Sequence, residues 1–145
     1  MVHTSGALSL DVLEGARRAG AEVGSFHPCQ AFATIEQALQ NLSGSTIGIE
    51  ASSEGLRALL ERMAEDIGCS YVRVPPEGKV LYHAAAVFAS NYMVTLVDVA
   101  LRLLERLDIE RTAAMGLLSP LLRGTLANIK KPGDPSGIDR TNSPR

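Results

Sequence analysis

The stretch TIGIEASSEGLRALLERMAEDIGCSYVRV, residues 46–74, contains the clearest structural pattern in this 145-residue sequence. It opens with a short apolar run, TIGIEA, that is typical of a buried strand. Ser53 then precedes a segment whose apolar residues recur at helical spacing, and Gly68 ends that segment. The apolar face consists of Leu56, Leu59, Leu60, Met63 and Ile67. A second apolar run, CSYVRV, follows, so we predict a strand–helix–strand unit.

Upstream of this unit the same alternation is repeated more weakly. Short apolar runs at residues 2–4 and 21–26 predict strands, and residues 9–19 and 34–42 predict helices. Thr34, with Gln37 three residues later, matches the capping-box pattern of a helix start. Strands that alternate with helices favour a parallel arrangement. We therefore expect a small, mostly parallel sheet of three or four strands over residues 1–75.

Downstream the pattern becomes helical. Pro75–Pro76 ends the last strand and marks a domain boundary. Residues 77 to about 106 predict one long helix, or two helices joined near 91–93. Asp108 is expected to cap a further helix that reaches about residue 131, with a kink or a division at Pro120. We thus predict an α/β segment at 1–75, a helical domain at 76–131 and a disordered tail at 132–145.

Composition narrows the classes of function. The net charge is only −2, aromatic residues make up 4% of the chain and Trp is absent, so we expect no nucleic-acid partner. The N-terminus lacks the pattern of a signal peptide. The apolar stretch at 84–104 is interrupted by polar residues, which favours a buried helical hairpin over a membrane span. Cys29 and Cys69 match no metal-site spacing, so we expect a cytoplasmic protein with reduced thiols and no metal.

Three polar residues in the first long helix are candidates for chemistry. Lys79, His83 and Asn91 fall on one slowly drifting stripe in a segment that is otherwise largely apolar. Polar groups on a largely buried helix need partners, and a cleft would supply them. Lys or His could move a proton and Asn could orient an oxygen. The alternative is an exposed Lys79, a His83 with its hydrogen bonds satisfied in the core, and an Asn91 at a helix break. Tyr82 is expected to pack with its hydroxyl outward.

Two strand ends carry further candidates. His3 and Ser5, followed by Gly6, come directly after the first strand, and His27 follows the second strand. In open α/β sheets such turns face ligands, and glycine lets a ligand approach the backbone closely. The alternative for each turn is an ordinary strand-ending turn, and without a family resemblance this alternative is favoured for the turn at His27. No G-x-G-x-x-G or G-x-x-x-x-G-K-[ST] motif occurs in the sequence.

Five segments together resemble a known family. They are VHTSGALS, GSFHPCQAF, TIGIEAS, KVLYHAAAVFASNYMVTLVDVA and LLSPLLRGTLANI, and the resemblance covers residues 2 to about 129. The family is an uncharacterised group of oxidoreductase-like proteins. Its members pair an N-terminal Rossmann-like NAD(P)-binding domain with a C-terminal helical domain similar to that of 6-phosphogluconate dehydrogenase.

The resemblance implies both an architecture and a set of site residues. The fold class would be α/β plus all-α, namely the remnant of a Rossmann-like sheet followed by the helical domain. His3, Ser5 and His27 would lie at the cofactor, and His83, Asn91 and Lys79 would be catalytic. The cofactor would be NAD or NADP, and this chain alone would not bind it, since the family's glycine-rich segment is missing and the chain looks truncated at both ends.

Two function hypotheses follow from these observations. In the first, the chain is the substrate and dimerisation half of an NAD(P)-dependent oxidoreductase that reduces a carbonyl or imine of a small molecule. A separately encoded Rossmann domain would then be its partner. In the second, it is a non-catalytic dimeric helical interaction module or a gene remnant. A homodimer is expected in either case, because the helix at 94–107 has more apolar surface than one packing seam needs.

Overall fold

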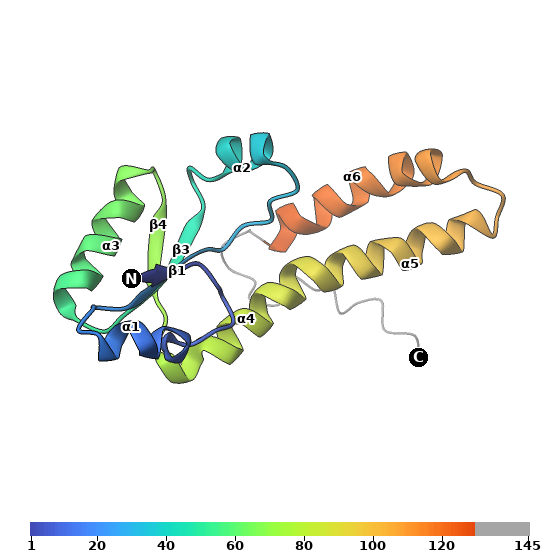
Figure 1. Ribbon diagram of the computed structural model, residues 1–145. Coiled ribbons are helices and arrows are strands. Elements are labelled where there is room, and N and C mark those ends of the chain that lie inside the picture. The colour runs from blue at the N-terminus through green and yellow to red at the C-terminus, as the bar shows by residue number, and fades with distance from the viewer. Residues whose placement is uncertain (130–145) are drawn as a thin grey trace. The chain divides into compact units, whose positions relative to one another are not determined.

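The structure is a computed structural model that describes residues 1–129 (Figure 1). The tail predicted at 132–145 lies outside the described residues. By its internal contacts the chain divides into two compact units, Met1–Met93 and Val94–Arg145. The last strand ends at Arg73, shortly before the predicted boundary at Pro75–Pro76, whereas the two units divide between Met93 and Val94. The first helical segment after the sheet therefore belongs to the same unit as the sheet.

The first unit is built on one small sheet. Its strands are β1 (Val2–His3), β2 (Gly24–Pro28), β3 (Thr46–Ala51) and β4 (Ser70–Arg73), and they lie in that order across the sheet. The β1–β2 and β3–β4 pairs are parallel, as expected, whereas β2–β3 is antiparallel. The sheet is therefore mixed.

The central antiparallel pair follows from the connection before β3. Helix α2 (Ile35–Asn41) buries none of its residues, and both Ile35 and Leu39 are exposed. It therefore does not pack on the sheet as a crossover helix would, and the chain returns beside β2 in the opposite direction. Helix α3 (Glu54–Asp66) does pack on β3, so the β3–α3–β4 connection gives a parallel pair.

Local signals place the helices of the sheet unit. A 3₁₀ turn (Leu10–Leu13) leads into α1 (Glu14–Arg18). The Thr34 and Ser53 hydroxyls accept backbone hydrogen bonds at the starts of α2 and α3, as predicted. Gly68, at φ 74°, adopts the left-handed conformation that ends α3.

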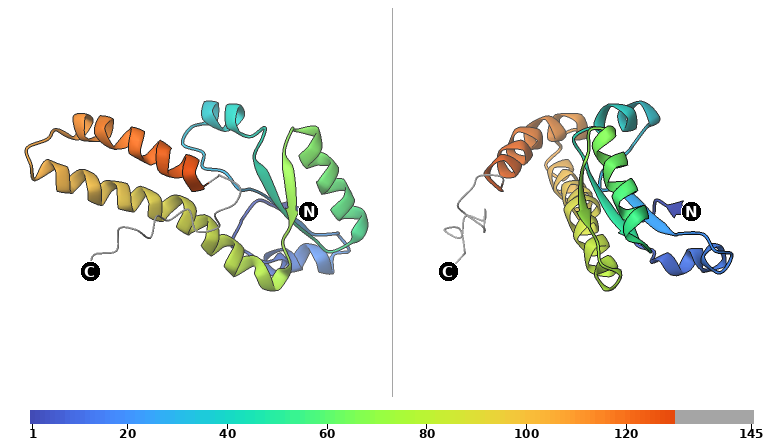
Figure 2. Two further views of the ribbon diagram at one scale, coloured as in Figure 1. Left: turned by 180° about the vertical axis from the view of Figure 1, so that it is seen from behind. Right: turned by 90° about the vertical axis from the view of Figure 1, so that its left-hand side faces the viewer.

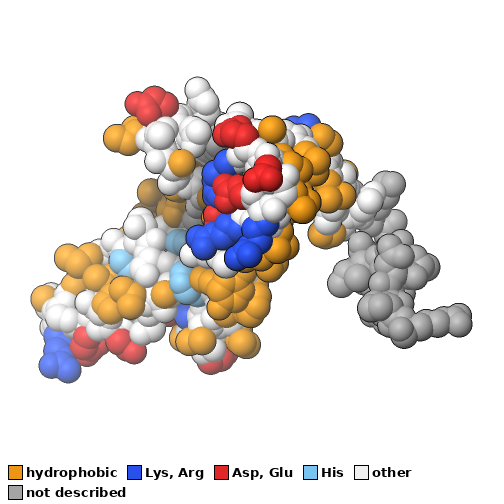
Figure 3. Space-filling model, turned by 90° about the vertical axis from the view of Figure 1, so that its right-hand side faces the viewer, with side chains coloured by type: hydrophobic (Ala, Val, Ile, Leu, Met, Phe, Trp, Pro, Cys, Tyr) orange, Lys and Arg blue, Asp and Glu red, His pale blue; other side chains and the backbone are white. Residues whose placement is uncertain are grey.

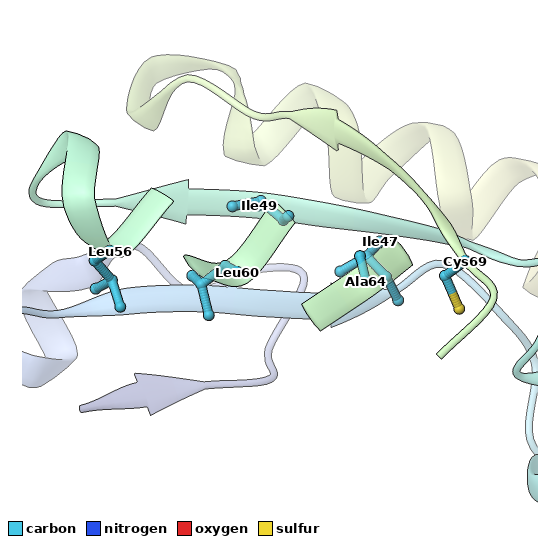
Figure 4. Packing of buried hydrophobic residues seen from close by; sticks show 6 residues of the cluster. All are labelled: Ile47, Ile49, Leu56, Leu60, Ala64 and Cys69. Atoms are coloured by element: carbon cyan, nitrogen blue, oxygen red, sulfur yellow. The ribbon is translucent and has the colours of Figure 1, made fainter. Parts of the chain in front are cut away.

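The main core lies between α3 and one face of β3 (Figure 4). Leu60 and Ala64 pack there against Ile47 and Ile49. The predicted apolar face of α3 is only partly buried, because the residues of α3 that are buried are Leu56, Leu60 and Ala64. The buried members are Leu56 and Leu60, and the exposed members are Leu59, Met63 and Ile67.

The opposite face of the sheet carries polar residues. Side chains alternate between the two faces of a strand, so Gly48 and Glu50 project away from the core that contains Ile47 and Ile49. Ser25 pairs with Glu50 and His27 with Gly48, which puts all four residues on one face. Helix α4 (Lys79–Val87) covers this face, and α3 covers the other (Figure 2).

One continuous helix follows the sheet. It runs from Pro76 to Glu105 and comprises a 3₁₀ turn (Pro76–Gly78), α4, a π-helical segment (Phe88–Tyr92) and α5 (Met93–Glu105). By length and composition it could cross a membrane, and only 6% of its apolar window is buried. The prediction of a buried hairpin at 84–104 is therefore wrong. The π-helical segment accommodates Ser90 and Asn91 without breaking the helix, close to where a junction was considered.

The second unit contains α5 and α6 (Arg111–Ile129). Among its described residues only Leu101 and Ala114 are buried, and hydrophobic side chains cover much of its surface (Figure 3). Asp108 does not cap α6, because its φ of 59° places it in the preceding turn. The Glu110 carboxylate instead accepts hydrogen bonds from the first backbone amides. Pro120 lies within α6 without dividing it.

Candidate functional site

A pocket of about 590 Å³ opens within the first unit. The end of β2 with its following loop forms one wall, and the long helix forms the other. Its lining comprises His27, Cys29, Gln30, Ala31, Phe32, His83, Ala86, Val87, Ala89, Ser90, Asn91 and Met93. Three of the predicted site residues, His27, His83 and Asn91, thus face one cavity although up to 64 positions separate them in the sequence (27 to 91).

The side chain of His83 lines this pocket and is half-buried. Its Nδ1 atom is buried and has no hydrogen-bond partner among residues 1–129. Buried polar atoms in proteins almost always have a partner, and each exception calls for an explanation. Among the described residues, His3 Nε2 and one carboxylate oxygen of Glu50, both outside the pocket lining, share this property.

The helix geometry brings Asn91 to the same wall. His83 and Val87 are four positions apart and therefore share a face of α4. The π-helical segment Phe88–Tyr92 widens the next turn by one residue, and both Ser90 and Asn91 of this segment line the pocket. Single π-helical turns inside α-helices frequently occur at functional sites.

Lys79 lies outside the pocket lining. It is only 2% exposed, and its ammonium group donates a hydrogen bond of 2.8 Å to the Ser25 hydroxyl. The same nitrogen lies 3.5 Å from a carboxylate oxygen of Glu50, which is also buried. Ser25 in turn donates to the backbone carbonyl of Ser5 at 3.4 Å. Lys79 therefore joins α4, the sheet and the N-terminal loop through one buried polar network.

His3 and Ser5 also lie outside the lining and contact this network instead. The Ser5 backbone N–H donates to His3 Nδ1 at 3.1 Å. The Ser5 hydroxyl accepts from the backbone amides of Ala7 and Leu8, which folds the loop back on itself. The next residue, Gly6, lies against the His27 ring, so the loop borders the pocket wall.

His27 forms a pair with Tyr82. The Tyr82 hydroxyl lies 2.9 Å from His27 Nδ1, and the two rings meet edge to face. The expectation that the Tyr82 hydroxyl points outward is therefore wrong. Side chains alternate between the two faces of β2, and His27 lies on the face that α4 covers, next to Tyr82. Burial and the neighbouring Cys29 raise the pKa of Tyr82 above its ordinary value, so the phenol stays protonated.

Sequence reasoning missed Ser25, Glu50 and Tyr82 as members of this site. For Ser25 and Glu50 a signal was present in the sequences of β2 and β3. Ser25 and His27 are two positions apart, as are Gly48 and Glu50, so each pair occupies one face of its strand. Three of these four residues, Ser25, His27 and Glu50, are polar, which indicates that this face meets something other than an apolar core.

No metal centre accompanies the pocket. Within residues 1–129, no group of three or more His, Cys, Asp or Glu side chains is arranged to hold a metal ion. The side chains that line the cavity offer imidazole, amide, hydroxyl and thiol groups beside apolar walls.

The histidines of the site should make stability depend on pH. Burial, followed by the positive charge of Lys79, lowers the pKa of both His3 and His27 in the folded protein. The unfolded chain then binds protons more readily than the folded chain, so stability falls as the pH drops below the ordinary histidine value of about 6.5. We expect the urea midpoint to fall between about pH 7 and pH 5. The variant His27→Asn should lose part of this dependence, and an identical slope in this variant would contradict the assignment.

Comparison with known proteins places the fold in a class. A sheet unit followed by long helices recurs in solved structures of Rossmann-like oxidoreductases with a C-terminal helical domain. A candidate NADP oxidoreductase from Bacteroides fragilis is 25% identical, with a TM-score of 0.76 over 95% of this chain and 50% of its own. A protein from Thermotoga maritima is 30% identical, with a TM-score of 0.75 over 94% of this chain and 51% of its own.

A third structure shares the fold at low identity. It is Plasmodium falciparum pyrroline carboxylate reductase with NADP bound, at 12% identity and a TM-score of 0.71 over 99% of this chain and 56% of its own. The chain thus spans about half the length of each structure that it matches. Residues 45–138 match the family model described as a domain of unknown function, DUF2520. The chain belongs to this family. No curated protein sequence matches it.

Proposed function

We propose that this chain forms the substrate-facing part of an NADP-dependent oxidoreductase that reduces a carbonyl or imine of a small molecule. The observation that carries the proposal is the pocket shared by His27, His83 and Asn91. All three side chains can form hydrogen bonds with a ligand in this cavity. Ala86, Val87 and Phe32 give the same cavity apolar walls, as small-molecule sites commonly have.

The residues of the pocket fit the nicotinamide end of such a cofactor and a small substrate beside it. His83 would hydrogen-bond the substrate oxygen or nitrogen, and Asn91 would orient the same group through its amide. The cofactor, when bound, would supply the hydride. Its phosphates would be held by protein outside this sequence, since no glycine-rich phosphate motif occurs in it. We propose that the whole protein is a soluble enzyme of the cytoplasm.

A titration of the full chain with reduced nicotinamide mononucleotide tests this function. We expect weak binding that perturbs the amide signals of His27, His83 and Asn91 in ¹H–¹⁵N spectra. His83→Ala and Asn91→Ala should each weaken binding about two- to tenfold, because one hydrogen bond is worth about 0.5–1.5 kcal/mol. Asn128→Ala, an exposed change in α6, is the matched control and should leave the dissociation constant unchanged.

Ribose 5-phosphate distinguishes nicotinamide recognition from recognition of the phosphate. If this compound produced the same perturbations, the pocket would hold a phosphate group and the proposed function would be wrong. The absence of any perturbation at the three residues would contradict it equally.

The second unit favours an additional role in assembly. Leu96 and Leu103 of α5 and Leu117 and Leu121 of α6 are all more than half exposed. Apolar surface on this scale marks an interaction site in proteins. We propose a second copy of this chain as the partner. The alternative function, a dimeric interaction module, would use the same surface. Sedimentation at micromolar concentration should give a dimer. Leu96→Glu should dissociate it and Arg106→Glu should not, whereas a monomeric wild type would overturn the proposal.

A further inference from the structure

The His27–Tyr82 pair is constructed from three separate parts of the first unit. His27 is on β2, Tyr82 is on α4, and Gly48 of β3 lies directly beneath the tyrosine. The distance between His27 Nδ1 and the Tyr82 hydroxyl is 2.9 Å, which is short enough for a well-formed hydrogen bond. The ring centroids are 5.6 Å apart with an interplanar angle of 87°.

Two glycines leave the space that this pair occupies. A Cβ atom at Gly48 would lie 2.6 Å from the Tyr82 hydroxyl oxygen. A Cβ atom at Gly6 would lie 2.6 Å from His27 Cε1 and 2.7 Å from Nε2. Any larger residue at either position would displace one of the rings. Glycine at both positions therefore lets the backbone approach the two rings closely.

The hydrogen bond between the Tyr82 hydroxyl and His27 Nδ1 can run in either direction, depending on which nitrogen of the imidazole carries its proton. The Tyr82 phenol stays protonated because burial and Cys29 raise its pKa, so it has a proton to donate. Burial, Lys79 and His83 lower the pKa of His27, which keeps the imidazole neutral at pH 7. A neutral imidazole that accepts at Nδ1 carries its own proton on Nε2.

We propose that Tyr82 is a positioning residue that holds His27 as the neutral Nε2–H tautomer, so that His27 offers a hydrogen-bond donor to a carbonyl oxygen in the pocket. A neutral imidazole of this kind polarises a carbonyl group without giving up its proton. His27 thus acts as the electrophile, and proton delivery is left to another group. This inference rests on the proposed function for the nature of the ligand, while the tautomer and its cause concern only residues of this chain.

Nitrogen NMR of the full-length chain labelled with ¹⁵N in its histidines tests the inference. In the wild type we expect His27 to show a protonated-type Nε2 signal and an unprotonated-type Nδ1 signal at pH 7. The Tyr82 hydroxyl proton should correlate with Nδ1 across the hydrogen bond. Tyr82→Phe should convert His27 into a mixture of tautomers. Tyr92→Phe, which removes the hydroxyl of an exposed tyrosine in the same helix, should leave the His27 signals unchanged.

Each outcome has a definite meaning. A proton on Nδ1, or a mixture of tautomers in the wild type, overturns the proposal even if Tyr82→Phe does not fold. An unchanged His27 in a folded Tyr82→Phe variant removes Tyr82 from the positioning role. If His27 keeps the Nε2–H tautomer but reduced nicotinamide mononucleotide leaves the pocket unperturbed, the proposed oxidoreductase function fails and the positioning role of Tyr82 stands.

Discussion

Replacing Lys79 by alanine is expected to lower the free energy of unfolding by about 3–5 kcal/mol, the cost of leaving one partner of a buried ion pair alone. Both Lys79 and Glu50 are almost completely buried, so solvent cannot replace the lost ammonium group. The Ser25 hydroxyl would lose its donor in the same change. Urea denaturation followed by circular dichroism measures the loss.

A double substitution separates the ion pair from simple packing. Lys79→Met combined with Glu50→Leu removes both charges at similar volume and should be more stable than either single variant. Arg18→Ala breaks an exposed ion pair with Glu14 and serves as the control, with an expected loss below about 1 kcal/mol. If Lys79→Ala cost no more than this control, the buried network would have no structural role.

The second large effect is expected in the core. Leu60→Ala should destabilise the protein by about 2–5 kcal/mol, because Leu60 is only 2% exposed and packs from α3 against β3. Its sequence neighbour Leu59 is 45% exposed and is the matched control. Leu59→Ala should cost less than about 1 kcal/mol. Equal losses in the two variants, measured by the same urea experiment, would contradict the assignment of the α3 core face.

Local patterns predicted the elements of the fold better than their arrangement. The apolar run at 46–51, the Ser53 cap and Gly68 each determine a structure through neighbouring residues, and the strand and helix formed there as expected. The antiparallel β2–β3 pair could not be predicted in this way. Its direction depends on whether α2 packs on the sheet, and the strand–helix alternation that favoured a parallel arrangement does not reveal that α2 leaves Ile35 and Leu39 exposed.

The site was predictable in part for a related reason. Helical spacing alone suggested that His83 and Asn91 share a surface, and both line the pocket with His27. The same spacing also grouped Lys79 with them, but its side chain is directed into the network with Ser25 and Glu50. The partner that determines the position of Lys79 is a carboxylate on β3, 29 residues earlier in the sequence (79 − 50). Helical periodicity contains no information about such a partner.

We propose that the cavity lined by His27, His83 and Asn91 receives a nicotinamide ring. The most direct measurement is a set of intermolecular nuclear Overhauser effects between the ring protons of reduced nicotinamide mononucleotide and the full chain. We expect contacts to the His83 imidazole and the Val87 methyl groups, because both residues line the cavity. Contacts confined to α3, for example to the exposed Met63, would contradict the proposal.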